Sequence, residues 1–342
     1  MPLIRATKHG LYCEAGDFYI DPWRGVERAV ITHAHSDHAR AGSKSYLSSA
    51  SGEDVLRARI GSAAPITPLP FGETTVMNGV RVSLHPAGHI VGSAQVRVEH
   101  RGEVWVVSGD YKTAPDAAAE NFEPVRCHHF ITECTFGLPI YRWPASEEVF
   151  AQINDWWRVN QAQGRTSVVF AYSLGKAQRV LAGVDASIGP IAVHGSVANF
   201  LPLYRKAGIT LPEAETLTKD NAAQIKGRGL VVAPGSAQGT PWLRKVAPHS
   251  LAFASGWMAV RGARRWRALD RGFVLSDHVD WPGLIDAVRA TGAETIGATH
   301  GHTAPFIRYA NEALGLNAYN VPTRFVGEST SGEEADEKEA VE

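Results

Sequence analysis

Residues 30–40, VITHAHSDHAR, contain three histidines and an aspartate within six positions, directly after a β-branched apolar run. Such a run predicts a strand that ends in a tight turn. Alternation of side chains along the turn directs His33 and His35 toward one point, and Asp37 and His38 toward another. This suits two metal ions about 3.5–4 Å apart better than one. Nitrogen and carboxylate ligands without thiolate favour zinc or manganese, with iron as an alternative.

The composition is typical of a soluble globular protein, because 44% of the 342 residues are hydrophobic and 20% are charged. The length suits one large domain or two ordinary ones. No run approaches the roughly 18 apolar residues of a membrane-spanning helix, and the N-terminus lacks the pattern of a signal peptide. The three cysteines form no CxxC motif, which fits a reducing cytoplasm.

Hydrophobic periodicity changes along the chain. The first 135 residues read as short strands rich in valine and isoleucine, with a helix at 52–60 and a hairpin turn at RGEV, residues 101–104. From about 141 to 270, a helix that opens with a capping serine is followed by alternating strands and helices, which predicts a parallel sheet. After 271 two further strand–helix pairs follow.

Charge is distributed unevenly. Residues 141–270 carry 16 basic and 8 acidic side chains, a net charge of +8. This basic block fits a polyanion partner and an ordinary solvated surface equally well. Residues 327–342 carry seven acids and one lysine, a net charge of −6, and read as a disordered tail.

The HxHxDH cluster resembles the signature of the metallo-β-lactamase superfamily. Three further positions match that family's pattern in the correct order: Asp21 in FYIDP, His89 in PAGHIVGS and Asp110 in VVSGDYK. The resemblance implies one metal held by His33, His35 and His89, and a second held by Asp37 and His38. Asp110 would bridge the two metals, and His300 in ATHGH would complete the second site.

About 190 residues separate Asp110 from His300. This long span resembles the one in the β-CASP nuclease branch, in which an extra domain is inserted between the two halves of the metallo-β-lactamase core. Glu133 in FITEC, His278 in LSDHVDW and His300 match that branch's later motifs. The chain resembles most the bacterial DNA-ligase-associated exonucleases, relatives of Artemis-type DNA-repair nucleases. The implied fold is α/β, a metallo-β-lactamase αββα sandwich with an inserted β-CASP α/β domain. Its expected parts are the core at 1–140 and 271–326, the insertion at 141–270 and the tail at 327–342.

The resemblance implies a metal-dependent phosphodiesterase that hydrolyses DNA in the cytoplasm, as a 5′ exonuclease of DNA repair that prefers single strands. Water activated on two divalent metals would attack the phosphate, and Asp37 would orient this water. His278 would donate a proton to the leaving oxygen, and Glu133 would hold the ring of His278 in place. RNA-processing members keep the histidine of the third motif, so His300 leaves a β-CASP ribonuclease as the alternative. A small-molecule hydrolase and a catalytically dead scaffold fit less well.

The expected partners are nucleic acid, with DNA favoured over RNA, and a DNA ligase by functional association; no membrane is expected. A helix N-terminus after a strand offers a phosphate site at Ser173, Lys176 and Arg179. A second cluster of cations and an aromatic side chain could bind a nucleic-acid strand: Arg264, Arg265 and Trp266.

Overall fold

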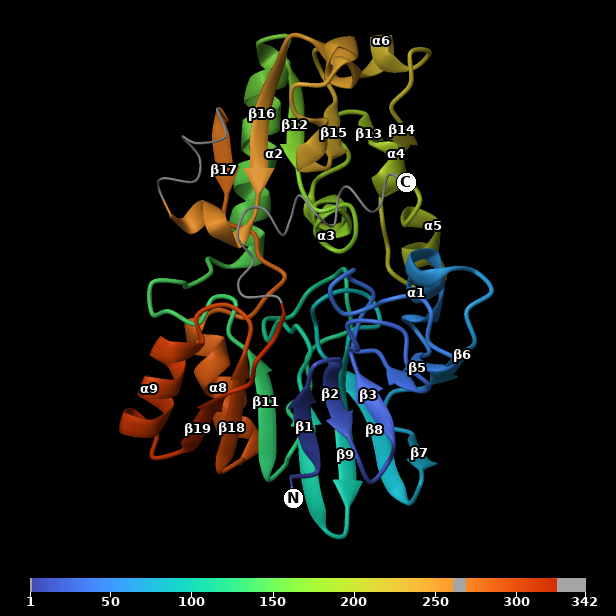
Figure 1. The fold of residues 1–342 in the computed structure, drawn as a ribbon. Coiled ribbons are helices and arrows are strands. Elements are labelled where there is room, and N and C mark those ends of the chain that lie inside the picture. Colours follow the sequence, from blue (N-terminus) through green and yellow to red (C-terminus); the bar gives the residue numbers. More distant parts are fainter. Residues whose placement is uncertain (1, 261–268, 325–342) are drawn as a thin grey trace. The chain divides into compact units, whose positions relative to one another are not determined.

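Alternating strand-forming and helix-forming segments give this chain a mixed α/β structure, here a computed structural model that describes residues 2–260 and 269–324. Within those residues there are three β-sheets, and the chain divides into two compact units (Figure 1). Unit 1 takes the described residues of 1–115, 119–142 and 278 onward, and unit 2 takes 116–118 and 143–277. The predicted nucleic-acid contacts Arg264, Arg265 and Trp266 and the acidic tail 327–342 lie outside the described residues.

Sheet A of unit 1 is built from the first short strands of the chain. Its order follows the sequence, antiparallel from β1 to β3 and parallel from β3 to β6. Helix α1 (Glu53–Ile60) lies between its last two strands in the sequence, where the periodicity predicted a helix. The strands are β1 (Ile4–Thr7), β2 (Gly10–Cys13), β3 (Phe18–Ile20), β4 (Ala29–Val30), β5 (Tyr46–Ser49) and β6 (Ile66–Leu69).

Sheet B of unit 1 has the order β19–β18–β11–β10–β9–β8–β7 and is parallel from β10 to β19. The predicted hairpin is confirmed: β9 and β10 are joined by Arg101 and Gly102, whose φ angles of 51° and 84° suit a type I′ turn. The strands are β7 (Thr74–Met77), β8 (Val80–Pro86), β9 (Ala94–His100), β10 (Glu103–Val107), β11 (His129–Glu133), β18 (Thr295–Thr299) and β19 (Asn317–Asn320).

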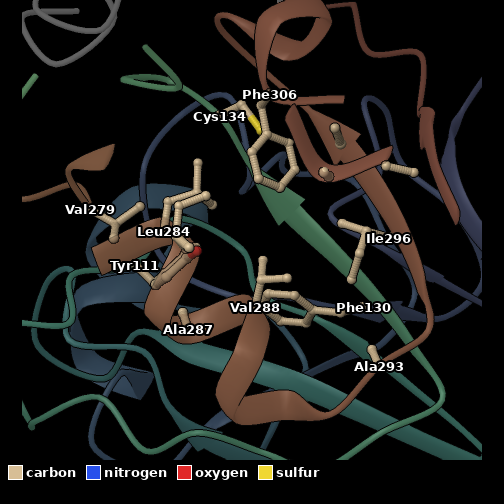
Figure 2. Packing of buried hydrophobic residues seen from close by; sticks show 14 of the residues in the cluster. Tyr111, Phe130, Cys134, Val279, Leu284, Ala287, Val288, Ala293, Ile296 and Phe306 are labelled. Carbon is tan, nitrogen blue, oxygen red and sulfur yellow. The ribbon is translucent and has the colours of Figure 1, made fainter. Parts of the chain in front are cut away.

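Both faces of sheet B are buried at its central strands β10 and β11, because alternate residues there enter different apolar clusters. On β11, Ile131 belongs to a core shared with sheet A, whereas Phe130 packs with helices α8 (Trp281–Thr291) and α9 (Thr303–Ala313). Figure 2 shows this second cluster, in which Val288 of α8 lies beside Phe130 of β11, and Phe306 of α9 lies beside Cys134, just after the end of β11. The two sheets therefore pack face to face, and helices cover the other side of sheet B.

Unit 2 contains the parallel sheet that the βαβ rhythm predicted, with the order β14–β13–β15–β12–β16–β17. Its strands are β12 (Thr166–Phe170), β13 (Ile191–Val193), β14 (Glu215–Thr216), β15 (Leu230–Ala233), β16 (His249–Ala254) and β17 (Arg271–Phe273). Its described helices are α2 (Ser146–Ala162), α3 (Lys176–Gly183), α4 (Gly195–Ala198), α5 (Leu201–Lys206), α6 (Ala222–Ile225) and the 3₁₀ turns η1 (Gly235–Ala237), η2 (Pro241–Val246) and η3 (Gly256–Ala259).

Two details differ from the sequence expectation. The prediction that a serine caps helix α2 is wrong. Ser146 is already helical, and the residue before it, Ala145, forms no side-chain hydrogen bond to the helix. Strand β17 pairs with β16, so residues 271–273 belong to the sheet of unit 2 and the chain passes to unit 1 only at His278. Among the described helices none is long and apolar enough to cross a membrane. All three cysteines are buried and free.

Replacing Leu284 by alanine should destabilise unit 1, because this side chain is 1% exposed within the cluster of Figure 2. We expect Leu284→Ala to lower the free energy of unfolding by about 2–5 kcal/mol, measured by urea denaturation. The exposed Asp286 on the same helix provides the control, and Asp286→Ala should change stability by less than about 0.5 kcal/mol. Equal effects of the two substitutions would contradict the packing of α8.

Candidate metal centre and acid–base pair

The carboxyl ends of parallel strands in unit 1 gather the predicted site residues. In sheet B, Asp110 follows β10, Glu133 ends β11 and His300 follows β18, and these three strands are parallel neighbours. His89 follows β8, which runs in the same direction as β10 because both are antiparallel to β9. Strand β4 of sheet A leads into the remaining predicted ligands, which lie between His33 and His38.

Four of these residues form the first donor group. His33, His35, His89 and Asp110 each offer one atom, and these atoms all lie within 4.8 Å of one another. Nδ1 of His35 lies 3.1 Å from Nε2 of His33 and 3.0 Å from Nε2 of His89. A tetrahedral zinc with bonds of 2.0–2.1 Å needs nitrogens about 3.3 Å apart, so this spacing fits a metal with little movement.

A second donor group lies beside the first and consists of Asp37, His38 and His300. One carboxylate oxygen of Asp110, Oδ2, lies 3.4 Å from Nε2 of His38 and 3.5 Å from Nε2 of His33. Asp110 therefore faces both groups. A cavity of about 50 Å³ borders Asp37, His38 and His300 and has space for water molecules.

Two observations test whether these residues fit metal ions. Among the described residues, the buried Nδ1 of His300 forms no hydrogen bond, and Nε2 of His38 has only the carboxylates of Asp37 and Asp110 beside it, at 3.4 Å, which is costly unless another group binds them. Burial alone would lower the pKa of His38, but the carboxylates of Asp37, Asp110 and Asp21 raise it well above its ordinary value. This pocket thus stabilises positive charge, and its donors are those that zinc, manganese and iron prefer.

The protonation states of the first donor group also suit metal binding, because a metal requires neutral imidazoles and ionised carboxylates. Burial and the neighbouring His38 lower the pKa of His33 well below its ordinary value. Burial would raise the pKa of Asp110, but His38 and other nearby histidines hold it well below its usual range.

Asp21 and Thr32 orient the histidines from outside the donor groups. Asp21 Oδ2 lies 2.7 Å from Nδ1 of His38 and accepts from Thr32 Oγ1 at 2.6 Å, and Thr32 Oγ1 lies 3.0 Å from Nδ1 of His33. Partners on Nδ1 leave Nε2 of both rings for the centre. The sequence singled out Asp21 by its motif without giving it a role, and no pattern marked Thr32.

Backbone conformation at the site is unusual. Asp21 and His300 have φ angles of 45° and 55°, in the left-handed region that side chains other than glycine seldom adopt. Gly109 before Asp110 has φ 57°, and a Cβ there would lie 2.6 Å from Cβ of Thr32. Such strain persists where the surrounding structure holds a functional geometry.

Glu133 and His278 form a buried pair next to Asp110. Nδ1 of His278 lies 3.0 Å from both carboxylate oxygens of Glu133, and Oε1 also accepts the backbone N–H of Tyr111 at 2.9 Å. Burial raises the pKa of Glu133. Two residues beyond His278, Asp280 caps helix α8 by accepting from the N–H of Gly283, which fixes this turn locally.

The other predicted positions lie elsewhere. His302, two residues after His300, is in neither donor group and stacks on Tyr141. In unit 2, Ser173 Oγ lies 2.8 Å from Ser196 Oγ, while Lys176 and Arg179 are buried and paired with Asp277 and Asp116. The two cations that were predicted to contact nucleic-acid phosphates therefore form ion pairs inside unit 2.

Comparisons with known proteins show which proteins this chain resembles. No family model matches the chain. A probable DNA ligase of Opitutus terrae is 31% identical over 324 residues, which are 94% of this chain and 31% of that protein. The human DNA cross-link repair 1A protein is 28% identical over 169 residues, 47% of this chain and 16% of that protein. Endoribonuclease YSH1 of Gibberella zeae is 25% identical over 190 residues, 52% of this chain and 22% of that protein.

The chain therefore spans about a third or less of the length of these relatives. Among solved structures, a protein of unknown function from Enterococcus faecalis V583 has a TM-score of 0.60 at 9% identity, covering 87% of this chain and 80% of that one. That likeness concerns the fold alone. Together with the motifs, the curated relatives confirm the resemblance read from the sequence, which is to the metallo-β-lactamase/β-CASP nucleases.

Proposed function

We propose that this chain is a metal-dependent nuclease that hydrolyses DNA, as a 5′ exonuclease that prefers single strands and acts in repair. The observation that carries the proposal is Asp110, which faces two donor groups while an acid–base pair lies beside it. In this proposal unit 1 is the metallo-β-lactamase αββα sandwich and unit 2 the inserted β-CASP domain.

His33, His35 and His89 would hold one divalent ion, Asp37, His38 and His300 the other, and Asp110 would touch both. When bound, the two ions supply an activated water and positive charge for the phosphoryl oxygens. Asp37 orients the attacking water from the rim of the cavity, where its side chain is partly exposed.

His278 protonates the leaving sugar oxygen in this scheme. Because its Nδ1 is held by Glu133, Nε2 is the atom that carries and donates the proton. Glu133 receives the backbone N–H of Tyr111 as well, so its carboxylate cannot rotate without losing a hydrogen bond. The pair therefore fixes the direction of the ring, and the form that donates the proton is the imidazolium, which carries a hydrogen on both nitrogens.

DNA is favoured because a probable DNA ligase and a DNA cross-link repair protein are among the relatives, and the first of these suggests association with a ligase. RNA is the second candidate. His300 completes a donor group here, and an endoribonuclease is also among the relatives. The net charge of +8 over 141–270 suits either polyanion.

The purified protein loaded with manganese or zinc should release short products from single-stranded DNA labelled at the 5′ end, and a chelator should abolish release. RNA of the same sequence provides the matched substrate. Preferential RNA cleavage would assign the chain to ribonucleases, and no cleavage of either substrate by metal-loaded protein would refute a nuclease.

Removing the imidazole of His278 should impair chemistry without emptying the metal sites. We expect His278→Ala to lower kcat by roughly 10²–10⁴, the range for loss of a general acid. Metal content, measured by atomic emission, should equal that of the parent protein. A variant that has also lost its metals would make His278 a ligand and end its role as proton donor.

Replacing Asp21 should weaken metal binding although Asp21 belongs to neither donor group. Without its carboxylate, His38 loses the partner that orients its ring, so Asp21→Ala should reduce affinity for zinc by about 10–100-fold. Competition with a fluorescent chelator measures this affinity. Asp17→Ala is the control, because the exposed Asp17 also has a left-handed backbone but pairs with Arg28. A comparable loss there would contradict the orienting role.

A further inference from the structure

Helix α3 carries two cations that are almost completely buried, Lys176 at 4% exposed and Arg179 at 1%. Lys176 Nζ lies 3.1 Å from Oδ1 of Asp277. Arg179 Nε lies 2.5 Å from Oδ2 of Asp116, and its Nη1 lies 3.8 Å from Oδ2 of Asp277. All four residues belong to unit 2, and together we call them the α3 clamp.

The two acids of the α3 clamp occupy particular places in the chain. Asp277 is the last residue of unit 2 before the chain continues into unit 1 at His278. Asp116 is the first residue of the stretch 116–118. This stretch lies in the connection between Asp110 and β11 but belongs to unit 2. The α3 clamp thus binds two segments that lead directly to residues of the candidate site.

Stability alone does not explain these cations. Buried ion pairs can often be replaced by apolar side chains without loss of stability, and their best-attested use is to specify one arrangement. A cation in the first helical turn is also disfavoured by the helix dipole, which Asp277 offsets at Lys176. Nor do the cations cap α3, since Gln178 accepts from the N–H of Gly175 at 2.7 Å and donates to the carbonyl of Ser173 at 2.9 Å.

We propose that Lys176 and Arg179 are positioning residues for His278, acting through Asp277. Holding the carboxylate of Asp277 on α3 restricts the backbone one peptide bond before His278, so that Nδ1 of His278 meets Glu133. This inference rests on the proton-donor role proposed for His278. It replaces the predicted contact of these two cations with phosphates by an internal role.

Nuclear magnetic resonance detects the hydrogen bond between Nδ1–H of His278 and Glu133 directly. In zinc-loaded protein with ¹⁵N-labelled histidine, the Nδ1–H resonance of His278 is assigned by its disappearance in His278→Ala. Lys176→Met should broaden or abolish this resonance and lower kcat by about tenfold or more, since small misplacement of a reacting group is costly. Affinity for a single-stranded oligonucleotide, compared in the His278→Ala background to prevent cleavage, should change less than twofold.

Two variants separate positioning from general damage. Val231→Ala removes methyl groups from the buried core of unit 2 without touching the α3 clamp, so His278 should keep its resonance and the protein its kcat. Lys176→Arg keeps the charge beside Asp277 and should recover part of the lost resonance and rate.

Each outcome has one meaning. An unchanged resonance and kcat in folded Lys176→Met overturn the proposal. A tenfold loss of oligonucleotide affinity with unchanged kcat also overturns it and makes Lys176 a phosphate contact. If the parent protein hydrolyses neither DNA nor RNA, the proposed function fails, and the resonance alone still decides whether the α3 clamp positions His278.

Discussion

The candidate site depends on one buried carboxylate, that of Asp110, which faces imidazoles from both donor groups. An ionised carboxylate at 5% exposure is costly unless positive charge compensates it. The surrounding histidines hold its pKa low, and its own charge raises that of His38. The attraction between the Asp110 carboxylate and the histidines thus holds the donor groups together, and the same negative charge favours binding of metal cations.

Sheet geometry brings this charge cluster together. Parallel neighbours β10, β11 and β18 end at one edge, so residues from three distant parts of the chain meet there. Gly109 is needed where the chain leaves β10, because any side chain would strike Thr32. Thr32 in turn touches His33 and Asp21, so one close backbone approach orients both donor groups.

Lys176 and Arg179 show why a charged residue in a basic segment is a poor guide to its partner. From the sequence, cations after a strand at a helix start suggest phosphate binding. The acids that neutralise them here, Asp116 and Asp277, are remote in the sequence and become neighbours only in the folded unit 2. Local patterns carry no information about such pairs.

The sequence alone determined the donor residues, because HxHxDH after an apolar run and the later motifs around His89, Asp110 and His300 depend on local spacing. It also determined the parallel sheet of unit 2, since strand and helix periods are local properties. Only the tertiary structure decided that Asp110 faces both groups, that Asp21 orients His38, and that the chain passes to unit 1 at His278. These features arise from contacts between residues far apart in the chain, which no single segment encodes.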